Sequence, residues 1–330
     1  VDLSDKAILV TGGTGSFGRH FVKTVLAGCR PKRLIVFSRD EAKQYDMAQD
    51  FTPEEKEALR FFIGDVRDRD RLEMAMREID IVIHAAALKQ VPAAEYNPFE
   101  CIKTNVYGAE NVMQAAIRTG VKQVVALSTD KAASPVNLYG ASKLASDKIF
   151  VAANNLVGSV GTRFSVVRYG NVLGSRGSVV PFYQKLIAED AASLPITDPR
   201  MTRFWITLDQ GVAFVLSCLP MMRGGEIFVP KIPSMKVVDL ATALAPDLPQ
   251  EVVGVRPGEK LHEVMITEDD ARNTLELPDR YVIYPTLYAQ PRQYDPAERK
   301  LPEDFSYRSD NNTEWLDDAT MAALLEQIDH

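Results

Sequence analysis

The feature that most constrains the fold is the alternation of short apolar segments with longer amphipathic ones in the first half of the chain. Each short segment is apolar nearly throughout, which is typical of strands buried on both faces of a parallel sheet. The longer segment Asp68–Asp80 instead repeats apolar residues at i, i+3, i+4 and i+7 from Leu72, which predicts a helix. The predicted strands are Ala7–Val10, Leu34–Phe37, Phe61–Ile63, Ile81–His84, Gln123–Leu127 and Ser165–Arg168.

This alternation predicts an α/β fold with a doubly wound parallel sheet, the Rossmann arrangement. The rhythm changes after about Gly170, where loops and prolines dominate. We therefore expect a Rossmann domain over residues 1–170 and a smaller C-terminal lobe over 171–330, with a strand near 226–229 returning to the sheet. The polar stretch Pro285–Asn312 predicts a tail along the surface, pinned down again by Trp315 and a helix-like end, Asp317–Ile328.

Composition excludes several classes of function. A net charge of −7 argues against non-specific nucleic-acid binding. The longest apolar stretch, Val212–Met222, is too short to cross a membrane, and no signal-peptide pattern opens the chain, so we expect a cytoplasmic protein. Three cysteines without C-x-x-C spacing and four scattered histidines predict neither a disulfide framework nor a metal site.

A glycine-rich loop directly follows the first predicted strand. In the run Thr11–Gly18, glycines stand at Gly12, Gly15 and Gly18, and a helical pattern begins immediately afterwards. Glycines allow the backbone to approach phosphates, and the free N–H groups of a helix N-terminus attract their negative charge. The loop therefore predicts a dinucleotide-binding site. The residues expected to cradle the pyrophosphate are Gly12, Thr14, Gly15, Ser16, Phe17 and Gly18.

The end of the second strand is expected to select the cofactor. An acidic residue there would select NAD, whereas this chain has Ser38 and Arg39 followed by Lys43, which suit a 2′-phosphate. Asp40 leaves NAD as an alternative, but we favour NADP. The remaining cofactor contacts are expected from Asp65 and Val66 beside the adenine, and from the small Ala85 and Ala86 where the cofactor crosses the sheet.

A tyrosine and a lysine share one helix face after the fifth strand. Tyr139 and Lys143 are four residues apart, and a nearby ammonium lowers the pKa of a phenol so that it can take a proton from an alcohol. Together with the glycine loop, this Y-x-x-x-K pair resembles the short-chain dehydrogenase/reductase superfamily, in its extended, nucleotide-sugar-modifying branch. Thr129 fills the place of the serine or threonine that holds the substrate oxygen in that superfamily.

An acid and an amine follow Thr129 directly, which an epimerase or reductase does not need. In a dehydratase, oxidation of C4 of a hexose makes the C5 hydrogen acidic, one group removes it, another protonates the departing C6 hydroxyl, and hydride returns to C6. We assign Asp130 as the acid and Lys131 as the C5 base. A base needs a depressed pKa, whereas the neighbouring Asp130 would raise that of Lys131.

Longer motifs resemble the inverting UDP-N-acetylglucosamine 4,6-dehydratases, which open the pathway to pseudaminic acid. The resemblance implies NADP recycled in each turnover, a UDP-linked 4-keto-6-deoxy-hexosamine with C5 inverted, and self-association into a homo-oligomer. Tyr139 favours the inverting group, because retaining relatives usually carry methionine there. The motifs that carry this resemblance are His84–Pro92, Ser128–Ala132, Arg168–Val172, Met201–Thr207, Val229–Met235 and Arg256–Glu263.

The substrate of such an enzyme is a UDP-sugar with two phosphates. Arginine forks match phosphate oxygens, and the resemblance places Lys89 and Asn171 near cofactor and substrate. The alternatives are a UDP-sugar 4-epimerase or 4-keto reductase on the same scaffold, or a non-catalytic NADP-binding regulator. The expected substrate contacts are Lys89, Asn171, Val179, Val180, Pro181, Phe182, Arg203, Arg256, Asn311 and Asn312.

Overall fold

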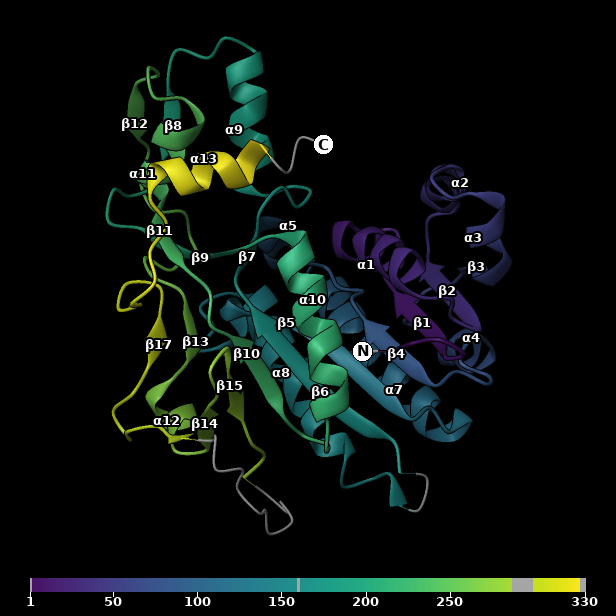
Figure 1. Cartoon of the computed structure of the whole chain (residues 1–330). Coiled ribbons are helices and arrows are strands. Elements are labelled where there is room, and N and C mark those ends of the chain that lie inside the picture. Colours follow the sequence, from purple (N-terminus) through teal and green to yellow (C-terminus); the bar gives the residue numbers. More distant parts are fainter. Residues whose placement is uncertain (1, 159–160, 287–298, 327–330) are drawn as a thin grey trace.

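The computed structural model describes residues 2–158, 161–286 and 299–326 (Figure 1). Within them, ten strands form one sheet in the order β16-β14-β15-β10-β6-β5-β4-β1-β2-β3. Those from β3 to β10 run parallel, and β15, β14 and β16 extend the edge antiparallel. Their bounds are β1 (Ala7–Thr11), β2 (Arg33–Ser38), β3 (Leu59–Ile63), β4 (Ile81–His84), β5 (Gln123–Thr129), β6 (Arg163–Tyr169), β10 (Ile227–Pro230), β14 (Thr274–Glu276), β15 (Arg280–Ile283) and β16 (Arg299–Lys300).

The order 3-2-1-4-5-6 confirms the doubly wound fold class. Every strand expected in the first half is present, and the strands other than β4 extend one or two residues beyond the expected limits. The side chains of β1 are all buried, because helices cover both faces of a parallel sheet. Continuous apolar runs, without alternation of polar and apolar residues, therefore correctly predicted buried parallel strands.

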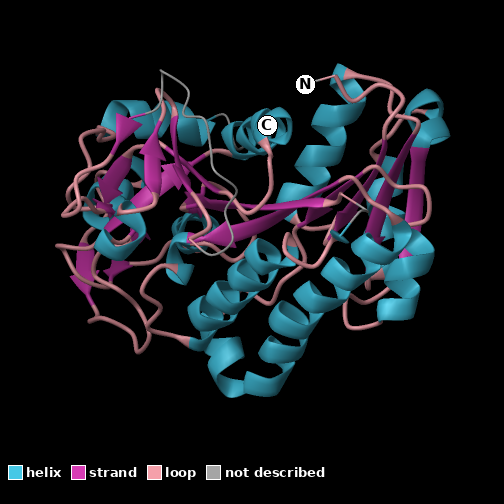
Figure 2. Ribbon diagram, turned by 90° about the horizontal axis from the view of Figure 1, so that it is seen from below, coloured by secondary structure: helices cyan, strands magenta, loops and turns pink. Residues whose placement is uncertain are grey.

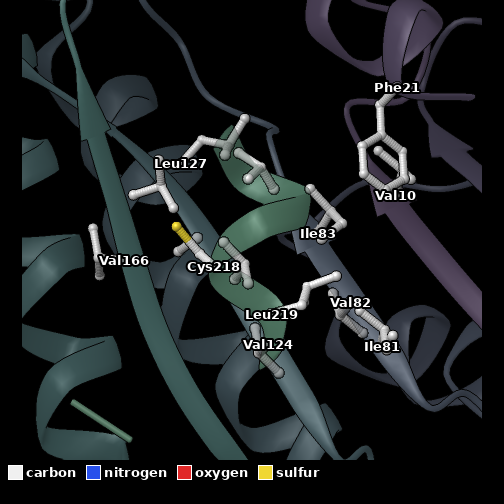
Figure 3. Packing of buried hydrophobic residues seen from close by; sticks show 14 of the residues in the cluster. Val10, Phe21, Ile81, Val82, Ile83, Val124, Leu127, Val166, Cys218 and Leu219 are labelled. Atoms are coloured by element: carbon white, nitrogen blue, oxygen red, sulfur yellow. The ribbon is translucent and has the colours of Figure 1, made fainter. Parts of the chain in front are cut away.

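Two layers of helices enclose the sheet, as Figure 2 shows. Helix α1 contacts α10 on one face, while α7 contacts both α4 and α8 on the other. Figure 3 shows part of the core, where Cys218 and Leu219 at the end of α10 lie near Val124 and Leu127 of β5. The helices before β6 are α1 (Ser16–Gly28), α2 (Glu41–Gln49), α3 (Pro53–Ala58), α4 (Arg69–Ala75), α5 (Val91–Tyr96), α6 (Pro98–Ile102), η1 (Lys103–Tyr107), α7 (Gly108–Thr119), η2 (Asp130–Ala132) and α8 (Leu138–Ala153).

The helix expected over Asp68–Asp80 is shorter than its apolar spacing indicated. Asp68 caps its start by accepting a hydrogen bond from the Arg71 amide, but α4 ends at Ala75. Glu78 has a φ of 57°, which a right-handed helix does not allow. Ile79 is nevertheless buried. The apolar spacing therefore predicted the burial of this residue correctly, although the segment after Ala75 is not helical.

The second half of the chain both extends the main sheet and builds a lobe beside it. Strand β10 pairs parallel with β6, and three small sheets lie outside the main one. The division of the chain at residue 170 remains a prediction. The other elements are β7 (Asn171–Val172), α9 (Val179–Ala188), β8 (Leu194–Ile196), β9 (Thr202–Ile206), α10 (Leu208–Cys218), η4 (Leu219–Met221), β11 (Ser234–Lys236), α11 (Val237–Leu244), β12 (Gln250–Val252), β13 (Val264–Ile266), α12 (Glu268–Ala271), β17 (Tyr307–Arg308) and α13 (Asp318–Glu326).

The C-terminal segment returns to the lobe as expected. Trp315 forms a β-bridge with Ser234, and α13 packs against α11. The helix expected over Asp317–Ile328 is α13, and residues 327–330 lie outside the described part, as do residues 287–298 of the expected tail. Among the described residues, no helix is long and apolar enough to cross a membrane.

Phe228 tests whether the strand from the second half stabilises the whole sheet. Its side chain is 1% exposed in β10, between β6 and β15. We expect Phe228→Ala to lower the free energy of unfolding by about 3–5 kcal/mol, because the cavity it leaves cannot collapse fully. Denaturant titration measures this change. Val252→Ala, in the exposed strand β12, is the control and should cost less than about 0.5 kcal/mol; equal effects would contradict a structural role for β10.

Candidate active site

One large cavity lies at the carboxyl ends of the parallel strands, between the main sheet and the lobe. Its volume is about 1570 Å³, and its walls come from both halves of the chain. The first half contributes the glycine loop and the ends of β2, β4 and β5. The second contributes β7, α9 and the segment around Arg256. In open α/β sheets, ligands bind at this edge.

The glycine loop forms a close-packed turn at one end of the cavity. Gly12 has a φ of +65°, and a Cβ there would lie 2.8 Å from the Ala86 backbone nitrogen. A Cβ at Gly18 would lie 2.5 Å from the Gly13 Cα. Helix α1 begins at Ser16 with Gly15 as its N-cap and no side-chain cap, so its first amides face the cavity edge without a side chain in the way. These features fit the pyrophosphate of a dinucleotide.

The structure brings the cofactor-contact candidates together around this cavity. They come from five separate stretches of the first half, which the strand order places side by side. The cavity is lined by all of Gly12, Thr14, Gly15, Ser16, Phe17, Gly18, Ser38, Arg39, Lys43, Asp65, Val66, Ala85, Ala86, Lys89, Tyr139 and Lys143.

The end of β2 presents both a cation, Arg39, and an acid, Asp40, at the cavity. Asp40 caps helix α2 by accepting from the Lys43 amide at 3.0 Å, and its carboxylate also pairs with the Lys43 ammonium at 2.8 Å. Arg39 is half-exposed and lies 3.6 Å from Asp65. Asp40 is thus held at the start of α2, while Arg39 is paired with Asp65 at the edge of the cavity.

Tyr139 and Lys143 lie one turn apart at the start of α8, which Asn137 caps by accepting from the Gly140 amide. Gly140 allows the helix to approach η2 closely, since a Cβ there would lie 2.2 Å from the Lys131 carbonyl oxygen. This contact holds Tyr139 beside Thr129, and their side chains are hydrogen-bonded. The packing of α8 on η2 therefore assembles the expected Thr129, Tyr139 and Lys143 at one wall.

The electrostatics of Tyr139 differ from the expectation. Burial raises its pKa to about 12, although the Lys131 ammonium and the hydrogen bond with Thr129 act in the opposite direction. Burial also lowers the pKa of Lys143, which lies one turn from the buried Asp147. In the chain alone, desolvation outweighs the effect of nearby ammonium groups on the phenol. Sequence spacing identified the neighbours of Tyr139 but not its degree of burial.

Lys131 lies between two carboxylates at the centre of the site. Its Nζ is 3.1 Å from Asp130 Oδ1 and 2.9 Å from Glu263 Oε1. Asp130 is fully buried and does not line the cavity, whereas Lys131 and Thr129 do. Asp130 Oδ1 also accepts a hydrogen bond from Thr129 Oγ1 at 2.9 Å. The acid expected beside the substrate is thus one residue behind the cavity wall, because η2 turns its side chain inward.

The charges of this cluster are unequal. Burial alone would lower the pKa of Lys131, but the carboxylates of Asp130 and Glu263 outweigh it and raise that pKa. Burial and the charge of Glu263 raise the pKa of Asp130. Burial opposes ionisation of Glu263 too, but Lys131 and Arg203 lower its pKa. Lys131 therefore carries a proton in the chain alone, opposite to the depressed pKa that a free base needs.

The expected substrate residues divide into those that reach the cavity and those that do not. Arg203 lines it but is buried, and its guanidinium donates to the carbonyls of Thr202 and Leu261. Arg256 is exposed and lies 3.5 Å from Glu259. Burial lowers the pKa of Lys89. The Oδ1 atom of Asn171 is buried without a hydrogen-bond partner in the described chain. The cavity is lined by Lys89, Asn171, Val179, Pro181, Phe182, Arg203 and Arg256.

Three expected substrate residues lie away from the cavity. Val180 is fully buried and packs with Trp205 in the core of the lobe. Asn311 accepts from the Arg308 amide, and Asn312 donates to the Ile232 carbonyl, so both hold the C-terminal segment in place. None of the three lines the cavity.

Sequence reasoning missed two buried carboxylates of the site. Glu263 ends the Arg256–Glu263 motif, whose resemblance to a family assigned it no role. Asp147 lies one helical turn beyond Lys143 and accepts hydrogen bonds from Ser128 at 2.8 Å and Arg168 at 3.3 Å. The i, i+4, i+8 spacing from Tyr139 was a usable signal for Asp147, whereas Glu263 is over 130 residues from Lys131 and only the tertiary fold places them together.

The fold and this site together define a short-chain dehydrogenase/reductase of the extended, nucleotide-sugar-modifying type. Residues 8–285 match the polysaccharide biosynthesis protein family. A UDP-N-acetylglucosamine 4,6-dehydratase (inverting) from Campylobacter jejuni is 57% identical over 98% of both chains. The chain therefore belongs to this family of polysaccharide biosynthesis proteins and, within it, to the group of inverting UDP-N-acetylglucosamine 4,6-dehydratases.

Other relatives set the range of chemistry found on this scaffold. A UDP-glucose 4-epimerase from Rickettsia canadensis is 42% identical, covering 84% of this chain and 83% of its own. The X-ray structure of Pen from Bacillus thuringiensis has a TM-score of 0.91 at 36% identity, covering 100% and 99% of the two chains. DesIV, a dTDP-glucose 4,6-dehydratase from Streptomyces venezuelae solved with NAD and TYD bound, has a TM-score of 0.69 at 26% identity, covering 77% and 86%.

Gly12 tests the assignment of the loop. We expect Gly12→Ala to weaken binding of the nicotinamide dinucleotide about tenfold, because an L-residue is strained at this positive φ and its Cβ would displace the loop from Ala86. Isothermal titration calorimetry measures the affinity. Gly211→Ala in α10, where a Cβ meets nothing within 4 Å, is the matched control and should bind as the parent does. Equal affinity in both variants would contradict the assignment.

Proposed function

We propose that the protein is an NADP-dependent UDP-N-acetylglucosamine 4,6-dehydratase that inverts C5. The observation that carries the proposal is the Lys131 ammonium, 3.1 Å from Asp130 and 2.9 Å from Glu263, in the same cavity wall as Tyr139. Oxidation at C4 needs only the tyrosine and lysine of the superfamily. A second proton-handling group beside them supports a reaction that also breaks bonds at C5 and C6.

We assign the first step to Thr129, Tyr139 and Lys143. Bound NADP supplies the hydride acceptor at C4 and the hydride donor at C6. Tyr139 takes the proton of the C4 hydroxyl, Thr129 orients that hydroxyl through the hydrogen bond it shares with Tyr139, and Lys143 holds the cofactor ribose. Because burial raises the pKa of Tyr139 to about 12, its proton transfer has to be coupled to the oxidation rather than precede it.

We assign the elimination to Lys131 and Asp130. One proton passes from this pair to the departing C6 oxygen as the C6–O bond breaks, and one enters the pair from C5 as the C5–H electrons form the double bond. When hydride returns to C6, a proton from the pair adds to C5 and completes the 4-keto-6-deoxy product. Lys131, which faces the cavity, acts as the C5 base after it has given its own proton to the departing C6 oxygen. Asp130 acts through its hydrogen bonds with Lys131 and Thr129, since it does not reach the cavity.

The substrate side supports a UDP-linked amino sugar. The exposed guanidinium of Arg256 is suited to the pyrophosphate, whereas Arg203 is committed to backbone carbonyls and to the site cluster. Lys89 and the unpartnered Oδ1 of Asn171 are suited to the sugar, and Phe182 to the uracil. We propose a 4-keto-6-deoxy product that enters pseudaminic acid synthesis in the cytoplasm.

We further propose that the chain self-associates. Tyr96, Phe99 and Tyr107 are 88%, 73% and 55% exposed on the consecutive elements α5, α6 and η1. Aromatic side chains grouped on a surface are typical of protein interfaces, which supports a homo-oligomer formed through this region.

Mass spectrometry of the product tests the reaction. Incubation with UDP-N-acetylglucosamine should yield a product lighter by one water without net consumption of NADPH, and Tyr139→Phe should lower the rate by about 10²–10⁴-fold, because it removes the proton acceptor at C4. Tyr45→Phe, exposed on α2 and outside the cavity, is the control. An isomer of unchanged mass would instead identify a 4-epimerase, the name carried by the Rickettsia canadensis relative.

The choice between NADP and NAD is tested at Arg39. We expect Arg39→Ala to weaken NADP binding about tenfold or more while leaving NAD binding nearly unchanged, because only NADP carries the 2′-phosphate. Fluorescence titration with each cofactor measures both affinities. Arg118→Ala removes an arginine of similar exposure, paired with Glu73 at 2.8 Å outside the cavity, and should affect neither. Equal losses for the two cofactors at Arg39 would rule out this selectivity.

A further inference from the structure

The carboxylate of Glu263 lies at the junction between the two halves of the site. It precedes β13, and its backbone amide donates to Ser309 Oγ at 2.9 Å. Ser309 Oγ is in turn within 2.7 Å of Thr202 Oγ1, so three separate segments of the second half fix its position. From this place Oε1 reaches Lys131 Nζ at 2.9 Å, across the cavity wall formed by the first half.

Glu263 faces more cations than Asp130 does. Besides Lys131, its carboxylate lies 3.7 Å from Arg203 Nε and 4.0 Å from Lys260 Nζ. Among the described residues, the salt bridge of Asp130 is with Lys131. When two buried carboxylates share a site, the one with more cations keeps the negative charge and the other favours its protonated form. The opposite pKa directions of Asp130 and Glu263 agree with this division.

We propose that Glu263 is a positioning residue of the reaction, the fixed anion that keeps the Lys131–Asp130 pair loaded with the proton it delivers to the departing C6 oxygen. This inference rests on the proposed function. Glu263 is at the cavity wall but only 1% exposed, and its carboxylate pairs with Lys131 at 2.9 Å, so we assign it a role that acts through Lys131. In the elimination the pair gives one proton to the C6 oxygen and regains one from C5. It gives a further proton to C5 when hydride returns to C6, and the proton that Tyr139 took from the C4 hydroxyl restores the count of the pair.

The geometry explains why the cluster at the cavity wall keeps a proton. Asp130 Oδ2 and Glu263 Oε2 are both buried without hydrogen-bond partners in the described chain. Such oxygens are costly to keep ionised together, so the cluster favours retaining a proton. Lys131 is the member that is partly exposed, and through it that proton reaches the cavity.

Glu263→Gln tests the inference, because glutamine keeps the shape and the hydrogen-bond acceptor but removes the charge. We expect C4 oxidation, followed by the absorbance of reduced nicotinamide, to persist, and water loss on the alkaline limb of the pH profile to slow about tenfold. The pair should lose its proton at lower pH without the anion, so the alkaline limb of the rate profile should move about one unit toward acid. The other charged groups facing the pair, Arg203, Lys260 and Tyr139, are unchanged.

Glu276→Gln is the matched control. Glu276 pairs with Lys231 at 2.8 Å in the same half of the chain and does not line the cavity, so its removal should leave the profile unaltered. A folded Glu263→Gln variant with the parent's profile would overturn the inference. If that variant does not fold, Glu263→Asp keeps the charge but draws it back from Lys131 by one methylene, and the alkaline limb should still move toward acid; an unmoved limb overturns the inference.

A second measurement separates this inference from the proposed function. The rate at which acetic anhydride acylates Lys131, followed by peptide mass spectrometry, depends on the fraction of free amine and needs no substrate. We expect Glu263→Gln to raise that rate about tenfold and Glu276→Gln to leave it unchanged. If the parent forms no dehydrated product yet acylation rises, the reaction is wrong and the role of Glu263 as counter-ion stands. An unchanged acylation rate overturns the inference whatever the reaction.

Discussion

The ion pair of Lys131 with Asp130 and Glu263 is the interaction on which the rest of the site depends. Asp130 and Lys131 follow β5 in the first half, and Glu263 comes from the second. A buried charge without a partner costs several kcal/mol, so the two halves have to remain together for these three side chains to stay ionised or hydrogen-bonded. The contact between Lys131 and Glu263 therefore both joins the two halves at the cavity and raises the pKa of Lys131.

Arg168 forms a second buried ion pair, with Asp147, and also connects the two halves of the chain. Arg168 lies in β6, and one guanidinium nitrogen donates to the Met265 carbonyl in β13. The other donates to the Asp147 carboxylate on α8. Asp147 in turn accepts from Ser128 beside the catalytic turn. Removing one partner from such a network leaves a buried charge, which makes the network specific for one placement of the lobe on the sheet.

Sequence predicted the sheet and its glycine loop well because both are local in character. An apolar run such as Ile81–His84 reports burial on two faces, and the loop from Gly12 to Gly18 has a spacing that a strand and a helix must satisfy together. The end of α4 was wrong because periodicity measures burial, and Ile79 remains buried beyond the helix. Val180 was misplaced for a related reason: each residue of a helix is rotated by about 100° from the one before it, and this rotation places Val180 in the core of the lobe with Trp205.

The behaviour of the acid–base groups was beyond sequence because it depends on burial and on distant partners. Adjacency of Asp130 and Lys131 indicated an ion pair, yet only the fold turns Asp130 away from the cavity and brings Glu263 to the other side of Lys131. The resulting cluster has two carboxylates, one lysine at its outer edge and further cations behind Glu263. The two carboxylates raise the pKa of Lys131. The base role proposed for it therefore requires that it first give its proton to the leaving oxygen. In the proposed elimination the leaving oxygen accepts that proton as the C5 proton is released, so a protonated amine is compatible with the base role proposed for Lys131.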